Sequence, residues 1–411
     1  MSIIKINKIG DDFVRNPENQ VDIKKVEYLG KIFKNNLSRV LGHDAAYSIQ
    51  LDDGRSFWSF GDTLIGEKLL AYDPEKELID VWLNTDWAKG NISMEPNTAC
   101  FVNAKNAEEL ITLKPFYIEK NGVAKKIIGT SLAPNRANRY RPIWPMDGIF
   151  LNKTIYLYDI FVDCGIFDPS KKEQSLDINL YGAGLSKAEF PYTTFTKLKP
   201  TIYPTPPKDL ANFCEYPYIW WNCEASENDG EKVPAFGIAV LKTPVDGYVY
   251  IYGSRIDNIN GEMVHGVYLS RVKTEKIEDL NKYEYYSKQG WVKQPKNLQM
   301  LFDGNANELS ISFNPYLNKY LCIYSYVGKI DSEGNISSGA MEEVHLRTAD
   351  YPQGPWSDPI VIYKAKKSHY LDTCYAAKEH PEFMEKNGKI IYFTFVSHQR
   401  YWPELVRVEF E

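Results

Sequence analysis

The chain has 411 residues, with 54 acidic side chains, 48 basic side chains and a formal net charge of −6. Because the charge is negative and no block of like charges occurs, neither a nucleic-acid partner nor an anionic membrane surface is expected. No apolar run reaches the roughly 18 residues that a membrane-spanning helix requires. The 29 Tyr, 19 Phe and 9 Trp favour β-strands and surfaces on which sugars stack.

The first residues, MSIIKINKIGDDFVRN, contain neither the apolar segment nor the small-residue cleavage site of a signal peptide. We therefore expect a cytoplasmic protein, or a secreted one whose leader has been removed. The six cysteines are scattered without a CxxC pair. We therefore expect them to be small buried side chains and not to form a disulfide framework or a zinc site. A bridge between Cys214 and Cys223 stays an alternative.

One hairpin motif is repeated five times along the chain. A turn dipeptide follows an apolar run and leads into about six strand-forming residues. The dipeptides are Asp53-Gly54, Asn152-Lys153, Asp246-Gly247, Asn318-Lys319 and Asn387-Gly388. Their spacing exceeds the roughly 40–50 residues of a compact repeat, so inserted loops are expected. We predict one all-β domain, a five-bladed β-propeller over residues 41–411, with residues 1–40 forming an N-terminal segment that helps to close the ring.

Further strands are expected to extend each hairpin into a blade. Helical patterns are sparse and occur over Lys105–Leu110 and Lys273–Lys282. The additional strands are predicted over Asn97–Asn103, Phe116–Ile118, Leu176–Tyr181, Tyr192–Leu198, Met263–Val272, Tyr283–Tyr286, Glu343–Thr348, Ile360–Tyr363 and Glu404–Phe410.

The first hairpin places two aspartates near each other. If its loop is the three residues Asp52–Gly54, Leu51 faces Arg55 and the same register sets Asp44 opposite Asp62. Opposed residues have Cβ atoms roughly 4.5–5.5 Å apart, so the pKa of one of the two carboxyls is expected to rise. A two-residue loop would place the acids on opposite faces. That both are ordinary turn-forming residues at strand ends also stays open.

Acidic side chains at the start of other hairpins would converge on the same mouth of the central channel. Asp147 precedes the second hairpin and Glu308 the fourth. Several carboxylates in an aromatic-rimmed hollow are what glycoside cleavage requires, because one acid protonates the leaving oxygen while another acts as base or nucleophile. The candidates for sugar contact are His43, Trp58, Trp144, Arg255, Arg347 and Tyr375, for which packing or surface exposure is the alternative.

No cofactor is expected. The histidines lack the HxxxH-type spacing of zinc sites, and no nucleotide-binding or GxSxG motif with a fitting context is present. A structural Ca²⁺ held by carboxylates and water in the channel stays an alternative.

Four segments give the chain a resemblance to a known family. They are DGRSFWSFGDT in the first hairpin, Trp144–Gly148, Asn307–Ser312 with the following NPYLNKYLCIYS, and LRTADYPQGPWSDP. The chain resembles five-bladed β-propeller glycosidases of the arabinanase–invertase type, and more closely the bacterial domain family that includes endo-D-arabinanases. It departs from the secreted enzymes by having no leader and by a long insertion between Asp163 and Pro234.

The resemblance implies a glycoside hydrolase with Asp44 and Asp62 as the leading catalytic carboxylates. Asp147 and Glu308 would be further acids or would set the pKa of the others. We expect the substrate to be an oligo- or polysaccharide that contains furanose or belongs to a bacterial envelope, with arabinan as the leading example. A cytoplasmic glycoside phosphorylase and a non-catalytic glycan-binding propeller are the alternatives.

Overall fold

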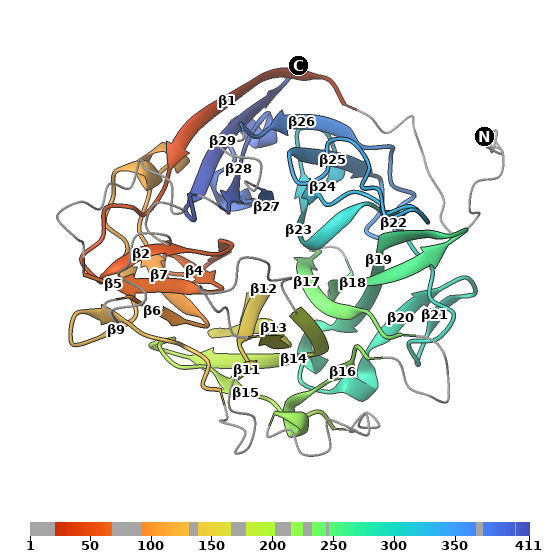
Figure 1. Cartoon of the computed structure of the whole chain (residues 1–411), viewed down its shortest axis with the longest axis horizontal. Coiled ribbons are helices and arrows are strands. Elements are labelled where there is room, and N and C mark those ends of the chain that lie inside the picture. The colour runs from red at the N-terminus through yellow and green to blue at the C-terminus, as the bar shows by residue number, and fades with distance from the viewer. Residues whose placement is uncertain are drawn as a thin grey trace.

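The computed structural model describes residues 21–67, 92–130, 139–165, 178–201, 215–224, 232–243, 246–366, 373–398 and 400–411. Within these ranges the chain consists mainly of antiparallel β-sheet, and five of the sheets have four or more strands. Figure 1 shows these sheets following one another around a common centre. The predicted all-β class is therefore confirmed and the arrangement is propeller-like, whereas a closed ring of five blades stays a prediction.

The first hairpin belongs to a four-stranded sheet with a smaller sheet beside it. The four strands are β3 (Tyr47–Gln50), β4 (Ser56–Phe60), β7 (Thr98–Val102) and β8 (Phe116–Tyr117). The smaller sheet consists of β2 (Val40–His43), β5 (Thr63–Gly66) and β6 (Ile92–Glu95). A separate two-stranded ladder consists of β9 (Glu119–Lys120) and β10 (Val123–Ala124).

The next two sheets have six strands each. The second sheet contains β12 (Ile143–Leu151), β13 (Thr154–Gly165), β14 (Ile178–Glu189) and β15 (Thr196–Lys197), with β11 (Arg139–Tyr140) and β16 (Trp221–Asn222) at its sides. The third contains β17 (Ala235–Lys242), β18 (Tyr248–Ile259), β19 (Glu262–Lys273), β20 (Glu284–Ser287), β21 (Gly290–Val292) and β22 (Phe302–Asp303).

The last two sheets have four strands each. The fourth contains β23 (Asn305–Asn314), β24 (Lys319–Tyr326), β25 (Glu343–Ala349) and β26 (Ile360–Lys364). The fifth contains β27 (Cys374–Glu379), β28 (Ile390–Ser397), β29 (Pro403–Phe410) and, from the other end of the chain, β1 (Ile23–Lys31).

Helical structure in the described ranges is limited to short 3₁₀ turns. Those within or beside the two predicted helical segments are η2 (Ala107–Ile111), η4 (Thr274–Lys276) and η5 (Leu280–Lys282); the others are η3 (Tyr216–Tyr218), η6 (Pro381–Phe383) and η7 (Lys386–Gly388). None of the described helices has the length and hydropathy that crossing a membrane would require.

The five predicted hairpin turns are confirmed. They connect β3 to β4, β12 to β13, β17 to β18, β23 to β24 and β27 to β28. Each contains a glycine or asparagine with a positive φ, a conformation that these two residues adopt at little cost. These residues are Gly54, Asn152, Gly247, Asn318 and Asn387. The additional predicted strands also overlap strands of the structure, and Leu176 and Asp177 of the predicted strand Leu176–Tyr181 lie outside the described residues.

One edge strand of each large sheet faces the centre of the molecule, and Figure 1 shows β12, β17, β23 and β27 in this position. Neighbouring central strands contact one another in the order β3, β12, β17, β23 and β27. Hydrogen bonds from the first sheet to the last connect Asp44 with Tyr375 and Ser48 with His380. The residues of all five central strands are thereby brought to one place.

The sheets pack face to face through apolar clusters. Phe57 of the first sheet shares a cluster with Leu157 of the second, and Ile323 of the fourth shares one with Phe393 of the fifth. Trp58 of the first sheet packs in a cluster with residues of the fifth. Because both faces of a sheet are covered, its strands read as nearly continuous apolar runs. Complete burial of one such large side chain stabilises the fold by about 1.5–3 kcal/mol.

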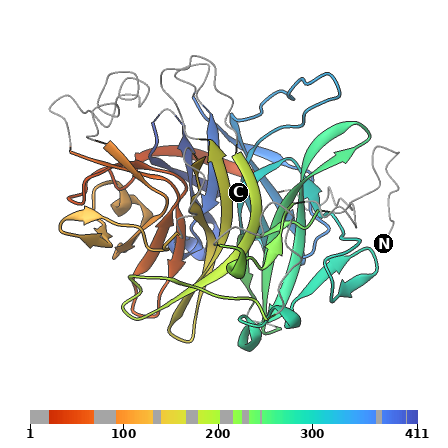
Figure 2. The same cartoon turned by 60° about the horizontal axis from the view of Figure 1, so that its bottom comes forward.

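Two long loops project on the same side of the molecule (Figure 2). One is the tip of the β18–β19 hairpin, and the other is the segment between β24 and β25. The two are joined where Met263 and Ile330 form an antiparallel bridge, with the Met263 N–H donating to the Ile330 carbonyl at 2.8 Å. Both loops leave the sheets on one side of the ring.

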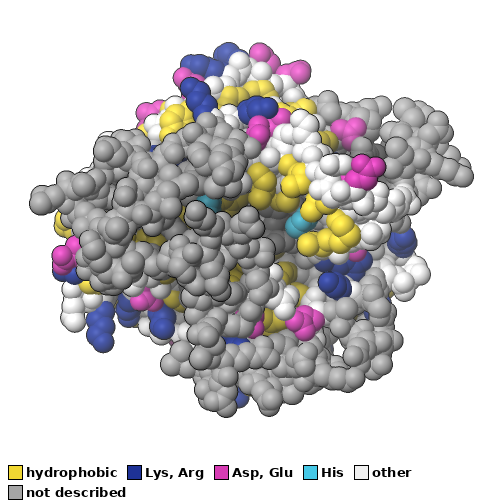
Figure 3. All heavy atoms as spheres, viewed as in Figure 1, with side chains coloured by type: hydrophobic (Ala, Val, Ile, Leu, Met, Phe, Trp, Pro, Cys, Tyr) yellow, Lys and Arg dark blue, Asp and Glu magenta, His cyan; other side chains and the backbone are white. Residues whose placement is uncertain are grey.

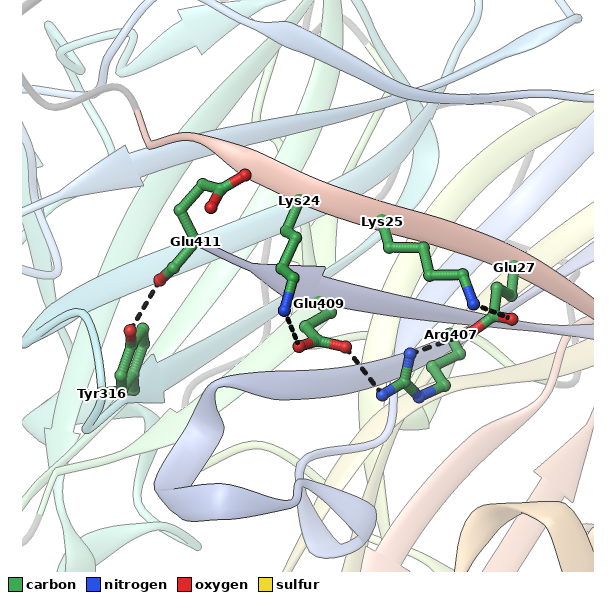
Figure 4. Close-up of polar contacts among 7 residues, drawn as sticks. All are labelled: Lys24, Lys25, Glu27, Tyr316, Arg407, Glu409 and Glu411. Carbon is green, nitrogen blue, oxygen red and sulfur yellow. Dashed lines mark hydrogen bonds and ion pairs between the residues drawn. The ribbon is translucent and has the colours of Figure 1, made fainter.

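The fifth sheet joins segments from the two ends of the described chain. β1 pairs with β29 in an antiparallel ladder that runs from Ile23 opposite Phe410 to Lys31 opposite Glu404. Figure 4 shows that charged side chains line this seam. Lys24 binds Glu409 at 3.0 Å, and Arg407 binds Glu27 at 2.9 Å. Lys25 also binds Glu27, and Arg407 also binds Glu409. Such exposed pairs contribute roughly 0–1 kcal/mol each, so the ladder and the apolar core beneath it hold β1 in place.

Gly237 provides a test of the close packing between the second and third sheets. Its φ is +120°, and a Cβ there would lie 2.2 Å from Cβ of Tyr158. We expect Gly237→Ala to lower the free energy of unfolding by about 1–3 kcal/mol more than Gly30→Ala. Gly30 is a matched control, because its φ is +122° and no atom lies within 4 Å of the added Cβ. Equal losses for the two variants in urea unfolding would contradict the role of the contact with Tyr158.

Candidate active site

Four of the five central strands leave the regular ladder near their entry ends. A bulge of this kind bends the strand and re-aims side chains, and it is common beside active sites. The interruptions lie between Pro145 and Gly148 in β12, between Phe236 and Ala239 in β17, between Asn305 and Leu309 in β23, and between Tyr375 and Lys378 in β27. They contain or adjoin Asp147, Glu308 and Lys378, so irregular backbone presents the charged side chains of the centre.

Asp44 and Asp62 lie opposite each other, as predicted. The Leu51 N–H donates to the Arg55 carbonyl at 2.9 Å, and the Asp44 N–H donates to the Asp62 carbonyl at 2.9 Å. The loop therefore has three residues, and the alternative register is excluded. Burial raises the pKa of Asp44 well above its ordinary value, and the neighbouring charges of Asp62 and then of Glu308 raise it further. The pair thus holds a proton more readily than an isolated carboxylate would.

Three aromatic side chains donate hydrogen bonds to this pair. The Tyr375 hydroxyl donates to Oδ1 of Asp44, and Nε1 of Trp144 donates to Oδ1 of Asp62 at 2.8 Å. The Tyr401 hydroxyl donates to the main-chain oxygen of Asp62 at 3.1 Å. An N–H donor favours the charged form of the carboxylate that accepts its bond. Trp144 therefore favours a negative charge on Asp62, whereas at Asp44 burial and the charge of Asp62 outweigh the donor from Tyr375 and raise the pKa.

Glu308 is half-buried on β23. Its Oε1 accepts a hydrogen bond from the Tyr47 hydroxyl at 3.0 Å. Burial raises the pKa of Glu308, while the charge of Lys378 and the bond from Tyr47 act in the opposite direction. Glu308 therefore combines a raised pKa with partial access to solvent, the two properties that a proton donor needs.

Asp147 is held more firmly than Glu308. Its Oδ1 accepts from the Gly148 N–H at 2.8 Å, and its Oδ2 accepts from the Val240 N–H of β17 at 2.7 Å. Burial raises the pKa of Asp147 to about 6, although the charge of Lys378 and the two main-chain donors oppose that rise. Because both oxygens accept main-chain bonds, Asp147 links β12 to β17 and supplies charge to the centre.

Sequence reasoning missed Lys378, which is only 2% exposed. Its ammonium donates to the Leu309 carbonyl at 2.6 Å and to the Ile238 carbonyl at 3.1 Å. It also lies 4.0 Å from the centroid of the Tyr47 ring. Burial lowers the pKa of Lys378 to about 8, against the charges of Glu308 and Asp147. The available signal was a lysine that directly follows the apolar run CYAA and precedes a predicted turn.

The predicted sugar contacts of His43 and Trp58 are wrong for this structure, because both side chains are 0% exposed. Nε2 of His43 lies 3.0 Å from the Tyr117 hydroxyl, and its ring centroid lies 3.8 Å from that of Phe60. The Trp58 ring lies 4.4 Å from that of His380. Both residues belong to the packing between sheets, so a ligand at the centre does not reach them.

The two predicted arginines also have other partners. Arg347 is 3% exposed, and it donates to the Tyr324 hydroxyl and the Ser357 carbonyl, each at 2.8 Å. Arg255 donates to Asp257 at 2.7 Å and to the carbonyl of Lys232 at 2.6 Å. The predicted sugar contact of Arg347 is therefore replaced by a structural role, because its side chain is buried. Arg255 forms an ion pair with Asp257 on β18. Of the six predicted sugar-contacting residues, the structure brings Trp144 and Tyr375 to the carboxylates.

The described residues contain no group of three or more His, Cys, Asp or Glu side chains arranged to hold a metal ion. Cys223 is free within the same ranges, whereas Cys214, its alternative disulfide partner, lies outside the described residues. The centre of the face drawn in Figure 3 is bordered by hydrophobic side chains and a histidine. The candidate site thus combines carboxylates with apolar surroundings.

Glu379 is a buried acid beside the cluster whose titration affects stability. Its Oε2 accepts from the Ser312 hydroxyl at 2.5 Å, and its Oε1 has no hydrogen-bond partner among the described residues. Burial raises the pKa of Glu379 to about 7 from an ordinary value of 4.5. A raised pKa in the folded state means that the folded protein binds the proton more tightly. The resulting stability is complete below about pH 4.5 and is lost as the pH rises through 7.

We therefore expect Glu379→Gln to weaken the loss of stability between pH 4.5 and pH 7.5. Over that interval the free energy of unfolding of the unmodified protein should fall more than that of the variant, by on the order of 3 kcal/mol. Urea unfolding at several pH values measures the difference. Glu385→Gln is the control, because Glu385 is a half-buried acid on a nearby turn. Parallel pH dependences for the unmodified protein and Glu379→Gln would contradict this prediction.

The chain is similar to known proteins over part of its sequence and over nearly all of its fold. Residues 212–407 match a family described as a domain of unknown function, DUF4185. No curated protein matches the chain. A candidate hydrolase from Bacteroides ovatus is 16% identical, with a TM-score of 0.55 over 99% of this chain and 97% of that chain.

Two further solved structures are glycoside hydrolases. A family 117 enzyme from Zobellia galactanivorans is 12% identical, with a TM-score of 0.41 over 96% of this chain and 91% of that one. A GH43_1 enzyme from Xanthomonas citri is 11% identical, with a TM-score of 0.45 over 92% of this chain and 90% of that one. At these identities the likeness concerns the fold, and the Bacteroides ovatus structure shares it along nearly the whole chain.

Proposed function

We propose that this protein hydrolyses a glycosidic bond at the centre of the ring, with residues 41–411 as the catalytic domain. The observation that carries the proposal is the pair of opposed carboxyls, Asp44 and Asp62, bound by Tyr375 and Trp144 respectively. Maintaining two acids side by side costs stability, and such perturbed pairs cluster at functional sites. The resemblance of the sequence to arabinanase-type glycosidases supports the same reaction.

The proposed roles follow from the partners of each carboxyl. Asp62, which accepts the Trp144 N–H, is the ionised base or nucleophile. Asp44 holds a proton, because burial and the negative charge of Asp62 raise its pKa, and Asp62 can then stay ionised. Glu308, with one oxygen bound by Tyr47, donates the proton to the leaving oxygen. Asp147 has both oxygens occupied by main-chain N–H groups, so it adjusts the charge of the site and does not transfer the proton.

For the substrate we propose a furanose-containing or bacterial-envelope oligo- or polysaccharide, with arabinan as the first example to test. The support is the resemblance of the sequence, together with Trp144 and Tyr375, which are half-buried beside the acids. Aromatic side chains with one apolar face and one polar edge suit the stacking of sugar rings. A cytoplasmic enzyme acting on imported oligosaccharides and a secreted enzyme acting on the polymer both agree with this proposal.

The test is to incubate the purified protein with a panel of plant and bacterial polysaccharides, including arabinans, and to measure the release of reducing sugar. The Asp44→Asn/Asp62→Asn double variant is the background control. Release by the unmodified protein alone supports the proposal. Turnover only in the presence of phosphate, with a sugar phosphate as product, would indicate a phosphorylase instead. Binding without product over long incubation would indicate a glycan-binding protein.

A further inference from the structure

Lys378 is the one described lysine that lies within the group of acids at the centre, and its placement is costly. Its side chain is 2% exposed, and moving an ammonium out of water is unfavourable unless hydrogen bonds or opposite charges compensate. Among the described residues its ammonium donates hydrogen bonds to two main-chain carbonyls and not to a carboxylate. Backbone hydrogen bonds thus hold the ammonium in place, and it interacts with the acids through its charge and not through direct hydrogen bonds.

The two carbonyls belong to the interrupted parts of two other central strands. Ile238 lies within the interruption of β17, and Leu309 is the residue at which β23 resumes its ladder. Ile238 is therefore outside the regular ladder, and the ammonium supplies a donor to its carbonyl and to that of Leu309. Lys378, which itself ends the interruption of β27, therefore joins three irregular segments at the centre.

Tyr47 connects this cation to the proposed proton donor. The ammonium lies 4.0 Å from the centroid of the Tyr47 ring, within the range of a cation–π interaction. The hydroxyl of the same tyrosine donates to Oε1 of Glu308 at 3.0 Å. Glu308 also directly precedes Leu309, whose carbonyl accepts the short bond from Lys378. Two separate routes, through the ring and through the backbone, thus connect the position of Lys378 to that of Glu308.

The charged and titratable groups around Lys378 come from the neighbouring strands. Glu308 of β23 and Asp147 of β12 act on it as negative charges, and Cys322 of β24 lies near it. On β27 itself, Glu379 binds Ser312. His380, which directly follows β27, lies against Ser48 and Thr394. The acids that face the ammonium are therefore those of the candidate site.

We propose that Lys378 is a positioning residue, an internal counter-cation that orients Glu308 and keeps the acid cluster compatible with a folded centre. Its relevance to catalysis rests on the proposed function, whereas its electrostatic role does not require a substrate. Lys378 is not assigned a contact with the reacting atoms. It acts through Glu308 and Tyr47.

The test follows the titration of the Glu308 carboxyl by infrared difference spectroscopy, with the band assigned by its loss in Glu308→Gln. In Lys378→Met we expect the midpoint of this titration to rise by about one pH unit or more, because a nearby cation favours the charged carboxylate. Lys378→Arg, which keeps the charge, should restore much of the original midpoint. An unchanged midpoint in Lys378→Met would overturn the proposal.

Lys273→Met is the matched control. Lys273 also donates to a main-chain carbonyl, that of Asp246 at 2.8 Å, and lies 3.8 Å from the centroid of the Tyr248 ring. It is on β19, away from Glu308, so its replacement should leave the Glu308 midpoint unchanged. An equal rise in the control would overturn the assignment to Lys378.

A second experiment applies if the Lys378→Met variant does not fold. The Lys378→Met/Glu308→Gln double variant leaves no carboxylate charge at Glu308 to be compensated, so it should recover a cooperative unfolding transition; no recovery would overturn the proposal. The infrared titration needs no substrate and so separates the two hypotheses. A shifted midpoint without any hydrolysis refutes the proposed function alone, and hydrolysis with an unshifted midpoint refutes the role of Lys378 alone.

Discussion

Asp62→Asn is expected to lower the rate constant of glycoside hydrolysis by about 10²–10⁴-fold, the usual contribution of a positioned acid or base. The amide keeps the size of the side chain but cannot accept a proton or attack as a carboxylate. It also removes the negative charge that the Trp144 N–H stabilises at 2.8 Å. Steady-state kinetics on the active polysaccharide, with the melting temperature recorded for each variant, measure the effect.

Asp53→Asn in the same hairpin is the control for Asp62→Asn. Asp53 is an exposed turn residue that binds Arg55 at 2.6 Å, and exposed pairs of this kind contribute little to stability. We expect its activity to stay within about twofold of the unmodified protein, since a surface change of a few tenths of a kcal/mol is typical. An Asp62→Asn variant that retains full activity would refute the assignment of Asp62.

Glu308→Gln is expected to reduce hydrolysis of the natural substrate by a similar factor, about 10²–10⁴-fold. Glutamine still accepts the hydrogen bond from Tyr47 but has no proton to give to the leaving oxygen. The loss should be much smaller for aryl glycosides with an acidic leaving group, because their departure needs little protonation. The descent of activity at high pH, which reports deprotonation of this acid, should also disappear in the variant.

Glu262→Gln is the matched control for Glu308→Gln, because Glu262 is an exposed acid at the tip of the β18–β19 hairpin. Comparison of natural and activated substrates separates proton donation from a general loss of structure. If Glu308→Gln lost activity equally on both classes of substrate, Glu308 would not be the proton donor, and Asp44, whose pKa is raised, would be the next acid to test.

Much of the fold could be predicted because short turns leave few choices of register. The loop Asp52–Gly54 determines that Leu51 pairs with Arg55, and the alternation of the two strands then carries the pairing to Asp44 and Asp62. The repeated turn dipeptides likewise locate the five hairpins. The identity of each blade's outer strands follows from apolar runs, since sheets covered on both faces require them.

The candidate site was less predictable where the chain departs from regular pairing. An extra residue in a strand reverses which face the following side chains occupy, and nothing local in the sequence marks the interruptions beside Asp147, Glu308 and Lys378. Trp58 illustrates the opposite difficulty. In a sheet with two covered faces, an aromatic side chain packs between sheets as readily as it lines a pocket, so residue type alone does not distinguish them.

The pairing of β1 with β29 has a consequence for how the protein is made. The last sheet is complete only after β29 has left the ribosome and found a partner synthesised nearly four hundred residues earlier, as Val26 opposite Val408 illustrates. Contacts between such distant segments slow folding, because a long loop must close before they form. Since β27 of that sheet carries the Tyr375 that binds Asp44, a nascent chain should complete its candidate site only when this last sheet forms.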